Sequence, residues 1–154
     1  VPGVGGERVG SEHGDRDDES DCAHPGSPSR LFEAQNATNR ARQAAIPRGE
    51  VEALRAIYAP DARIWHDHDQ ATQSVEQNLQ VLAWVVKNIA ELRYEEIRRH
   101  ATPTGFVQQH VLRGRAPNGT PLEVPACIVC AVAGGRITRL DEYLDSAQLE
   151  ALRG

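Results

Sequence analysis

Apolar positions repeat at intervals of three and four over Glu50–Tyr58 and again over 75–89, whereas residues 31–46 are rich in residue types that favour helices. This period predicts helices, because side chains three and four residues apart lie on one face of a helix. The elements expected there are a helix over 31–46 with Ser29 as its cap and Pro47 at its end, a short helix over Glu50–Tyr58, a strand in ARIWHDH, and a helix that opens with Ser74-Val-Glu-Gln77.

The last of these helices has the clearest pattern in the chain. Ser74 and Gln77 match a capping box, in which each side chain accepts a hydrogen bond from the other residue's backbone N–H. The apolar positions of this helix form one stripe, made of Val75, Leu79, Leu82, Val85, Val86 and Ile89.

After Glu91 the apolar period falls to two, which is typical of strands. Four strands are expected over Leu92–Thr102, Phe106–Arg113, Leu122–Val132 and Arg136–Asp145, and then a short helix over Ala147–Leu152 that Ser146 caps. Helices come first and a long antiparallel sheet follows, so the predicted fold class is α+β.

Residues 1–30 have a different composition from the rest of the chain. They are acidic, rich in glycine, proline and serine, and contain no aromatic side chain. Such a segment buries too little apolar surface to offset the entropy lost on ordering, so we expect a disordered acidic tail. The remaining residues, 31–154, are expected to form a single domain.

Composition excludes several classes of protein. The 154 residues carry a net charge of −5, which disfavours a protein that binds nucleic acid through its phosphates. No apolar run is long enough for a membrane span, and the N-terminus lacks the apolar core of a signal peptide, so we expect a cytoplasmic protein. Three cysteines exclude a disulfide framework, and Cys127 and Cys130 should point to opposite faces of their strand.

Three features together resemble the nuclear transport factor 2-like superfamily, closest to its SnoaL-like and ketosteroid-isomerase-like branch. They are the run YAPDARIWHDHD, the long capped helix, and the run GGRITRLDEYLDSAQL. The resemblance covers roughly residues 33–152. It implies a cone-shaped, curved antiparallel sheet wrapped around N-terminal helices, a deep pocket inside the sheet, and a homodimer.

Strand period then predicts which side chains face that pocket. Alternate residues of a strand share a face, and the family pattern turns the faces of His66, His110 and Glu142 inward. The expected inner set is Ile64, His66 and His68 on the first strand, Phe106, Gln108, His110 and Leu112 on the third, and Thr138, Leu140, Glu142 and Leu144 on the last. This face is unusually polar for a core.

The catalytic residues of the family's known enzymes mostly fall on other residue types here. The tyrosine, base and acid of ketosteroid isomerases fall on Arg42, His66 and near Ile128. The arginine and the two aspartates of limonene-epoxide-hydrolase-like members fall on Gln108, His110 and Glu142, and their water-holding pair falls on His66 and His68. The acidic residue of SnoaL-like cyclases corresponds to Glu142, so one carboxylate of the expected type remains.

These positions suggest acid/base chemistry. Burial beside Leu140 and Leu144 should raise the pKa of Glu142, which suits it to proton transfer near neutral pH. We expect Glu142 to be the acid/base, His110 to be its partner, and His66 to bind substrate or an oxyanion. Both histidines can either exchange protons at physiological pH or hold the carboxylate and the substrate by hydrogen bonds. The expected substrate-binding residues are His68, Gln108, Phe106, Ile64, Leu140 and Trp84. Alternatively, the polar groups satisfy one another in a buried network.

Two classes of function therefore remain open. The first is an isomerase, cyclase or hydrolase that acts on a small hydrophobic molecule without a cofactor. The second is a non-catalytic module that binds a lipophilic ligand or mediates dimerisation. Zinc ligation by His66, His68, His110 and Glu142 is chemically feasible, but the family does not usually need a metal, so none is expected. Trp65, on the outer face of the sheet, is expected at a homodimer interface.

Overall fold

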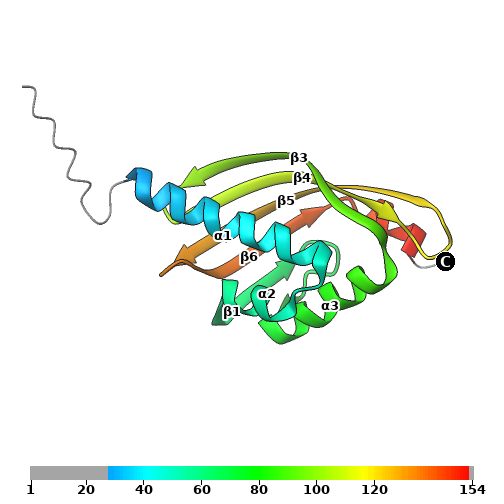
Figure 1. The fold of residues 1–154 in the computed structure, drawn as a ribbon, viewed down its shortest axis with the longest axis horizontal. Helices are drawn as coiled ribbons and strands as arrows, with labels where there is room; N and C mark the ends of the chain where they lie inside the picture. The colour runs from blue at the N-terminus through cyan, green and yellow to red at the C-terminus, as the bar shows by residue number, and fades with distance from the viewer. Residues whose placement is uncertain (1–27, 153–154) are drawn as a thin grey trace, which may run out of the picture.

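The computed structural model describes residues 28–152, in which helices line one face of a curved six-stranded sheet (Figure 1). The elements in chain order are α1 (Pro28–Arg48), α2 (Val51–Ile57), β1 (Tyr58–His66), β2 (Thr72–Gln73), α3 (Val75–Asn88), β3 (Ala90–Thr102), β4 (Gly105–Arg115), β5 (Pro121–Ala133), β6 (Arg136–Leu144) and the 3₁₀ helix η1 (Ser146–Leu152). The predicted α+β class is confirmed, and each predicted helix and strand is present with shifted ends. The predicted cap at Ser146 is wrong, because η1 includes Ser146 and its first turn is capped by Asp145 Oδ1, which accepts from the Ala147 N–H at 3.1 Å. The two-residue strand β2 was not predicted.

The strands lie in the order β2-β1-β6-β5-β4-β3. Consecutive strands pair antiparallel from β3 to β6, and β2 pairs antiparallel with β1. β1 and β6, in contrast, run parallel, so the prediction of a wholly antiparallel sheet is wrong for this pair. A period of two reports which face a side chain occupies but carries no information about strand direction. This parallel pair brings the N-terminal strand beside the C-terminal one.

The helices cover the inner face of the sheet, and the main core lies between them. In Figure 1, α1 runs across the sheet, with α2 and α3 beside β1. The largest fully buried apolar side chains in the described residues are Ile46, Leu54, Tyr58, Ile64, Phe106, Ile128, Ile137 and Leu140. The predicted division of faces is confirmed, because Ile64 and His66 are buried whereas Arg63 is exposed.

The beginning of α1 corrects one predicted boundary. The helix starts at Pro28, so residues 28–30 belong to the domain and not to the tail, and Ser29 lies within the helix instead of capping it. Proline suits the first position of a helix, where its missing N–H would have no partner anyway. The rest of the predicted tail, residues 1–27, lies outside the described residues.

α3 forms as the capping box predicts. The Gln77 backbone N–H donates to Ser74 Oγ at 3.3 Å, and the Ser74 N–H donates to Gln77 Oε1 at 2.9 Å. The helix ends at Asn88, and Ile89, the last residue of the predicted stripe, is its C-cap. No helix within residues 28–152 is both long and apolar enough to cross a membrane.

The outer face of the sheet carries exposed apolar side chains. Val129 and Tyr143 are both exposed there, and the Tyr143 ring lies edge-on to Trp65 with ring centroids 5.3 Å apart. Cys127 is half-buried whereas Cys130 is buried in the core, and both are free thiols, as expected for opposite faces of β5. A homodimer through this face stays a prediction.

Candidate active site

An internal cavity of about 350 Å³ lies between α1, α3, η1 and the inner face of the sheet. Its volume is in the range of small-molecule sites. Apolar side chains of α3, β4–β6 and η1 form much of its wall, and its polar residues include Arg42, His66, Asn78, Tyr94, His110 and Glu142. Val81 and Trp84 line it and are also exposed, so the cavity meets solvent beside α3.

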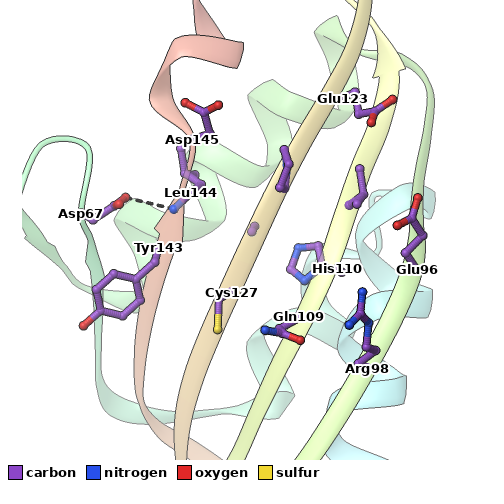
Figure 2. A pocket seen from close by; sticks show the side chains of 13 residues that line it. Asp67, Glu96, Arg98, Gln109, His110, Glu123, Cys127, Tyr143, Leu144 and Asp145 are labelled. Atoms are coloured by element: carbon purple, nitrogen blue, oxygen red, sulfur yellow. Dashed lines mark hydrogen bonds between the residues drawn. The ribbon is translucent and has the colours of Figure 1, made fainter.

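A larger hollow of about 660 Å³ is an open groove on the outer face (Figure 2). Glu96, Arg98 and Gln109 lie along it from β3 and β4, with Cys127 and Tyr143 across it on β5 and β6. Most of these polar side chains are exposed to water. The inner cavity is the better candidate, because it holds buried ionisable groups.

Glu142 and His66 form a close pair at the cavity wall. The parallel ladder of β1 and β6 places the two residues directly opposite each other, and His66 Nε2 lies 3.3 Å from Glu142 Oε2. The predicted partnership of Glu142 with His110 is wrong, because within residues 28–152 the histidine in contact with the carboxylate is His66. The parallel pairing that produces the contact was not predicted from the sequence.

The pKa of Glu142 is lowered, contrary to the expectation that burial would raise it. Burial does act to raise the pKa, and it is the largest single influence. The hydrogen bond from His66 and the charges of Arg42, His66 and His110 together outweigh burial, because all of them favour the ionised carboxylate. Glu142 is therefore a carboxylate at neutral pH and is suited to accept a proton.

His110 lies on β4, next to the ring of Tyr94, with ring centroids 5.0 Å apart. Burial lowers the pKa of His110 to about 4, and the charges of Arg42 and Arg99 add to this effect, although Glu142 opposes it. The imidazole is therefore neutral at physiological pH. The expectation that His110 exchanges protons near neutral pH is wrong, because a buried imidazolium beside two arginines is strongly disfavoured.

Hydrogen bonds fix which nitrogen of His110 carries the proton. Gln108 Oε1 accepts from Asn39 Nδ2 at 2.5 Å and from Arg99 Nε at 2.9 Å. The amide nitrogen of Gln108 therefore faces His110 Nδ1, 3.0 Å away, and donates to it. Because Nδ1 accepts, the proton of the neutral ring lies on Nε2. Within residues 28–152, Nε2 has no hydrogen-bond partner, so it is available as a donor to a ligand.

Arg42, on α1, is a site residue that the sequence analysis missed. It is 3% exposed, lines the cavity, and donates from Nε to the Tyr58 hydroxyl at 3.0 Å. Its Nη1 is buried without a hydrogen-bond partner, and no ion pair identified within residues 28–152 includes Arg42. A signal was present in the sequence, because Gln35, Asn39 and Arg42 follow helical spacing and form a buried polar stripe.

The structure brings only part of the predicted site to the cavity wall. Glu142, His110, His66, His68 and Trp84 all line it, and their proposed roles stay predictions. The predicted substrate-binding residues Ile64, Phe106, Gln108 and Leu140 do not line it. These four side chains do face inward, but they are almost fully buried under α1 and α2, where no ligand reaches them.

The lowered pKa of His110 should make folding stability depend on pH. Between about pH 7 and about pH 5 the unfolded chain binds a proton at His110 that the folded protein rejects, so stability falls as the pH falls. We expect His110 to account for a loss of about 2 kcal/mol in the free energy of unfolding over this window. Urea unfolding at the two pH values measures the loss.

The variant His110→Gln should lose this part of the pH dependence. His100→Gln is the matched control, because His100 is exposed on β3. An equal pH dependence in His110→Gln and in the unsubstituted protein would show that His110 titrates normally in the folded state.

Comparisons with known proteins match this fold. A protein from Bacillus subtilis named for a proposed isomerase activity has 16% identity and a TM-score of 0.70, over 80% of this chain and 95% of that one. A protein from Xanthomonas campestris pv. campestris named for a proposed polyketide cyclase activity has 18% identity and a TM-score of 0.69, over 79% and 98%. An LEH-like epoxide hydrolase from M. tuberculosis has 14% identity and a TM-score of 0.63, over 79% and 90%.

At these identities the three structures establish the fold and not the activity. No curated protein matches the sequence. The model of the SnoaL-like domain, however, matches residues 39–140, which include α1 from Asn39 onward, α2, α3 and nearly all of the sheet. The resemblance found in the sequence is thereby confirmed, and the chain belongs to the SnoaL-like domain family.

Proposed function

We propose that the cavity binds a small, mainly apolar carbonyl compound and that Glu142 removes a proton from the carbon next to the carbonyl group. The observation that carries the proposal is the contact between His66 and Glu142 at the wall of a cavity that is also lined by a neutral His110 with an unpaired Nε2–H. A carboxylate base and a hydrogen-bond donor in one apolar cavity are what enolisation requires.

The proposed step conserves atoms and charge. The C–H bond breaks, its proton moves to the Glu142 carboxylate, and its electron pair forms a carbon–carbon double bond. The carbonyl electrons move to oxygen, where His110 Nε2–H donates a hydrogen bond to the resulting oxyanion. Return of the proton to another carbon gives an isomer. Attack of the enolate carbon on a second carbonyl of the same molecule closes a ring. The π electrons of that carbonyl move to its oxygen, which takes the proton back from Glu142.

The pKa directions favour proton abstraction over the opening of an epoxide by water. Epoxide opening requires a group that protonates the leaving oxygen. Glu142 is held in its ionised form, and burial raises the pKa of Tyr94 to about 12, so neither is a good acid at neutral pH. The names of the relatives support both classes of reaction, and these side chains favour isomerase or cyclase chemistry.

Deuterium exchange into a simple ketone tests the proposal without knowledge of the natural substrate. The bicyclic ketone 2-tetralone is mostly apolar and has exchangeable protons beside its carbonyl. When the ketone is incubated with the protein in D₂O, deuterium should replace the protons next to its carbonyl group faster than in buffer alone. Proton NMR follows this exchange. Isothermal titration calorimetry with the same ketone measures binding separately.

Binding and exchange distinguish the two classes of function. Binding with faster exchange supports an enzyme. Binding without faster exchange, over a panel that also includes 1-indanone and 1-decalone, would contradict catalysis and favour a non-catalytic ligand-binding module. Absence of both over the whole panel would contradict the proposed substrate class.

A further inference from the structure

The guanidinium of Arg42 is buried, charged and incompletely paired. Its side chain is almost fully buried at the cavity wall, where Nε is bound to the Tyr58 hydroxyl and Nη1 has no partner. An arginine cannot lose its proton in a protein, so burial cannot be relieved by neutralisation. A buried cation without a hydrogen-bonded counter-ion is costly, and such groups are normally paired.

The groups around Arg42 do not supply this partner. The side chains that affect the pKa of Arg42 are Tyr58, Tyr94 and Glu142. Both tyrosines are neutral at physiological pH, because burial raises their pKa values. The carboxylate of Glu142 is in contact with His66, and it forms no ion pair with Arg42. Because the guanidinium of Arg42 lines the cavity, a molecule that enters the cavity can supply the missing partner.

We propose that Arg42 is an anion-binding group, and that the cavity takes an apolar molecule with one anionic oxygen, which binds to the guanidinium of Arg42. The inference rests on the proposed function and deepens it, because an enolate is an apolar molecule with one anionic oxygen. Carboxylates and phenolates share this chemistry. His110 Nε2–H, at the same cavity, is a second donor for the same oxygen.

Glu142 sets a second expectation for the same site. Its negative charge shares the cavity with Arg42, so it repels an anion that enters. Removal of this charge should strengthen anion binding. During the proposed reaction the negative charge would leave Glu142 as it appears on the substrate oxygen, and the total charge around Arg42 would remain constant. This arrangement favours the enolate over a permanently anionic substrate.

Calorimetry with a matched pair of ligands tests the inference. The carboxylate 2-naphthoate and its neutral analogue 2-naphthamide have nearly the same shape. We expect the protein to bind 2-naphthoate about 10- to 100-fold more tightly, as a charge-assisted hydrogen bond would produce. Equal affinities, or a preference for the amide, would overturn the inference with no variant needed.

Variants assign the preference to Arg42. Arg42→Met should reduce affinity for 2-naphthoate about 10- to 100-fold and leave affinity for 2-naphthamide within about threefold. Arg40→Met is the matched control, because Arg40 is exposed on the same helix and should change neither affinity. Glu142→Gln should bind 2-naphthoate more tightly than the unsubstituted protein. A preference that survives in Arg42→Met would place the anion elsewhere.

A second probe separates phenolates and enolates from carboxylates. The visible absorption of 4-nitrophenol distinguishes its ionised from its neutral form, so it reports which form is bound. The unsubstituted protein should bind the phenolate, and Arg42→Lys should retain part of this preference because it keeps the charge. Binding of neutral nitrophenol together with tight binding of 2-naphthoate would restrict the ligand to carboxylates and overturn the link to an enolate.

These experiments fail independently of the ketone exchange. Exchange of 2-tetralone without a preference for 2-naphthoate would leave the proposed function standing and remove the anion site. A preference for 2-naphthoate without exchange of 2-tetralone would support the anion site and contradict the proposed function.

Discussion

Glu142→Gln should exchange deuterium into 2-tetralone about 10²- to 10⁴-fold more slowly than the unsubstituted protein, with ketone binding retained. This is the usual contribution of a positioned general base. Glutamine has nearly the same shape as glutamate, and its Oε1 can still accept from His66 Nε2. The cavity should therefore keep its form while the group that accepts the proton is lost.

Two further variants test whether the loss is specific to the Glu142 carboxylate. Glu123→Gln is the matched control, because Glu123 is an exposed carboxylate on the outer side of β5, paired with Arg113, and its loss should leave exchange unchanged. Glu142→Asp keeps a carboxylate but withdraws it by one methylene, so partial activity is expected. Exchange by Glu142→Gln at the rate of the unsubstituted protein would remove Glu142 from the mechanism.

The pH profile gives a second test of the same role. The base must be ionised to act, so exchange is lost as the pH falls through the pKa of Glu142. Because the pKa lies below 4.5, the ordinary value for a glutamate, the acidic limb of the rate profile should lie below pH 4.5. An acidic limb above that value would point to a carboxyl group whose pKa is raised by burial, as the sequence alone had suggested.

The parts of the fold that could be predicted are those encoded by local pattern. The capping box at Ser74 fixes the start of α3, and alternation along β4 places Gln108 and His110 on one face. Both depend only on neighbouring residues and on the geometry of one element. The inward direction of the faces of His66, His110 and Glu142 follows instead from the family resemblance.

The parts that could not be predicted depend on long-range pairing. The contact between His66 and Glu142 requires β1 to lie parallel to β6, which no local pattern specifies. The sign of the pKa shift at Glu142 depends on Arg42, which approaches from α1, a helix without a continuous apolar stripe. Strand alternation places Ile64 and Leu140 on the inner face of the sheet, but α1 and α2 cover them. Alternation identifies the residues of the inner face, but it does not show which of them line the open cavity.

Gln108→Glu should move the proton of His110 from Nε2 to Nδ1 and slow ketone exchange about 10²- to 10³-fold, as expected when one oxyanion donor is lost. One oxygen of the new carboxylate can still accept from Asn39 and Arg99. The other would face His110 Nδ1, where the amide nitrogen of Gln108 now donates. A carboxylate cannot donate, so the contact is satisfied only if Nδ1 carries the proton.

Nitrogen-15 NMR of the histidine rings measures this change directly, because protonated and unprotonated ring nitrogens have different chemical shifts. At about pH 8, above the pKa of an ordinary histidine, the neutral ring should be observed in both proteins, with its proton on different nitrogens. The added carboxylate should also raise the pKa of His110 from its present value of about 4.

Gln109→Glu supplies the matched control, since Gln109 is the neighbouring residue on β4 and is exposed on the outer face. The same change of charge there should alter neither the His110 signals nor the exchange rate. A Gln108→Glu variant that keeps the proton on Nε2 would show that Gln108 does not set the tautomer. Unchanged exchange after a demonstrated move of the proton would exclude His110 as the oxyanion donor. That outcome would leave Arg42 as the group facing the substrate oxygen.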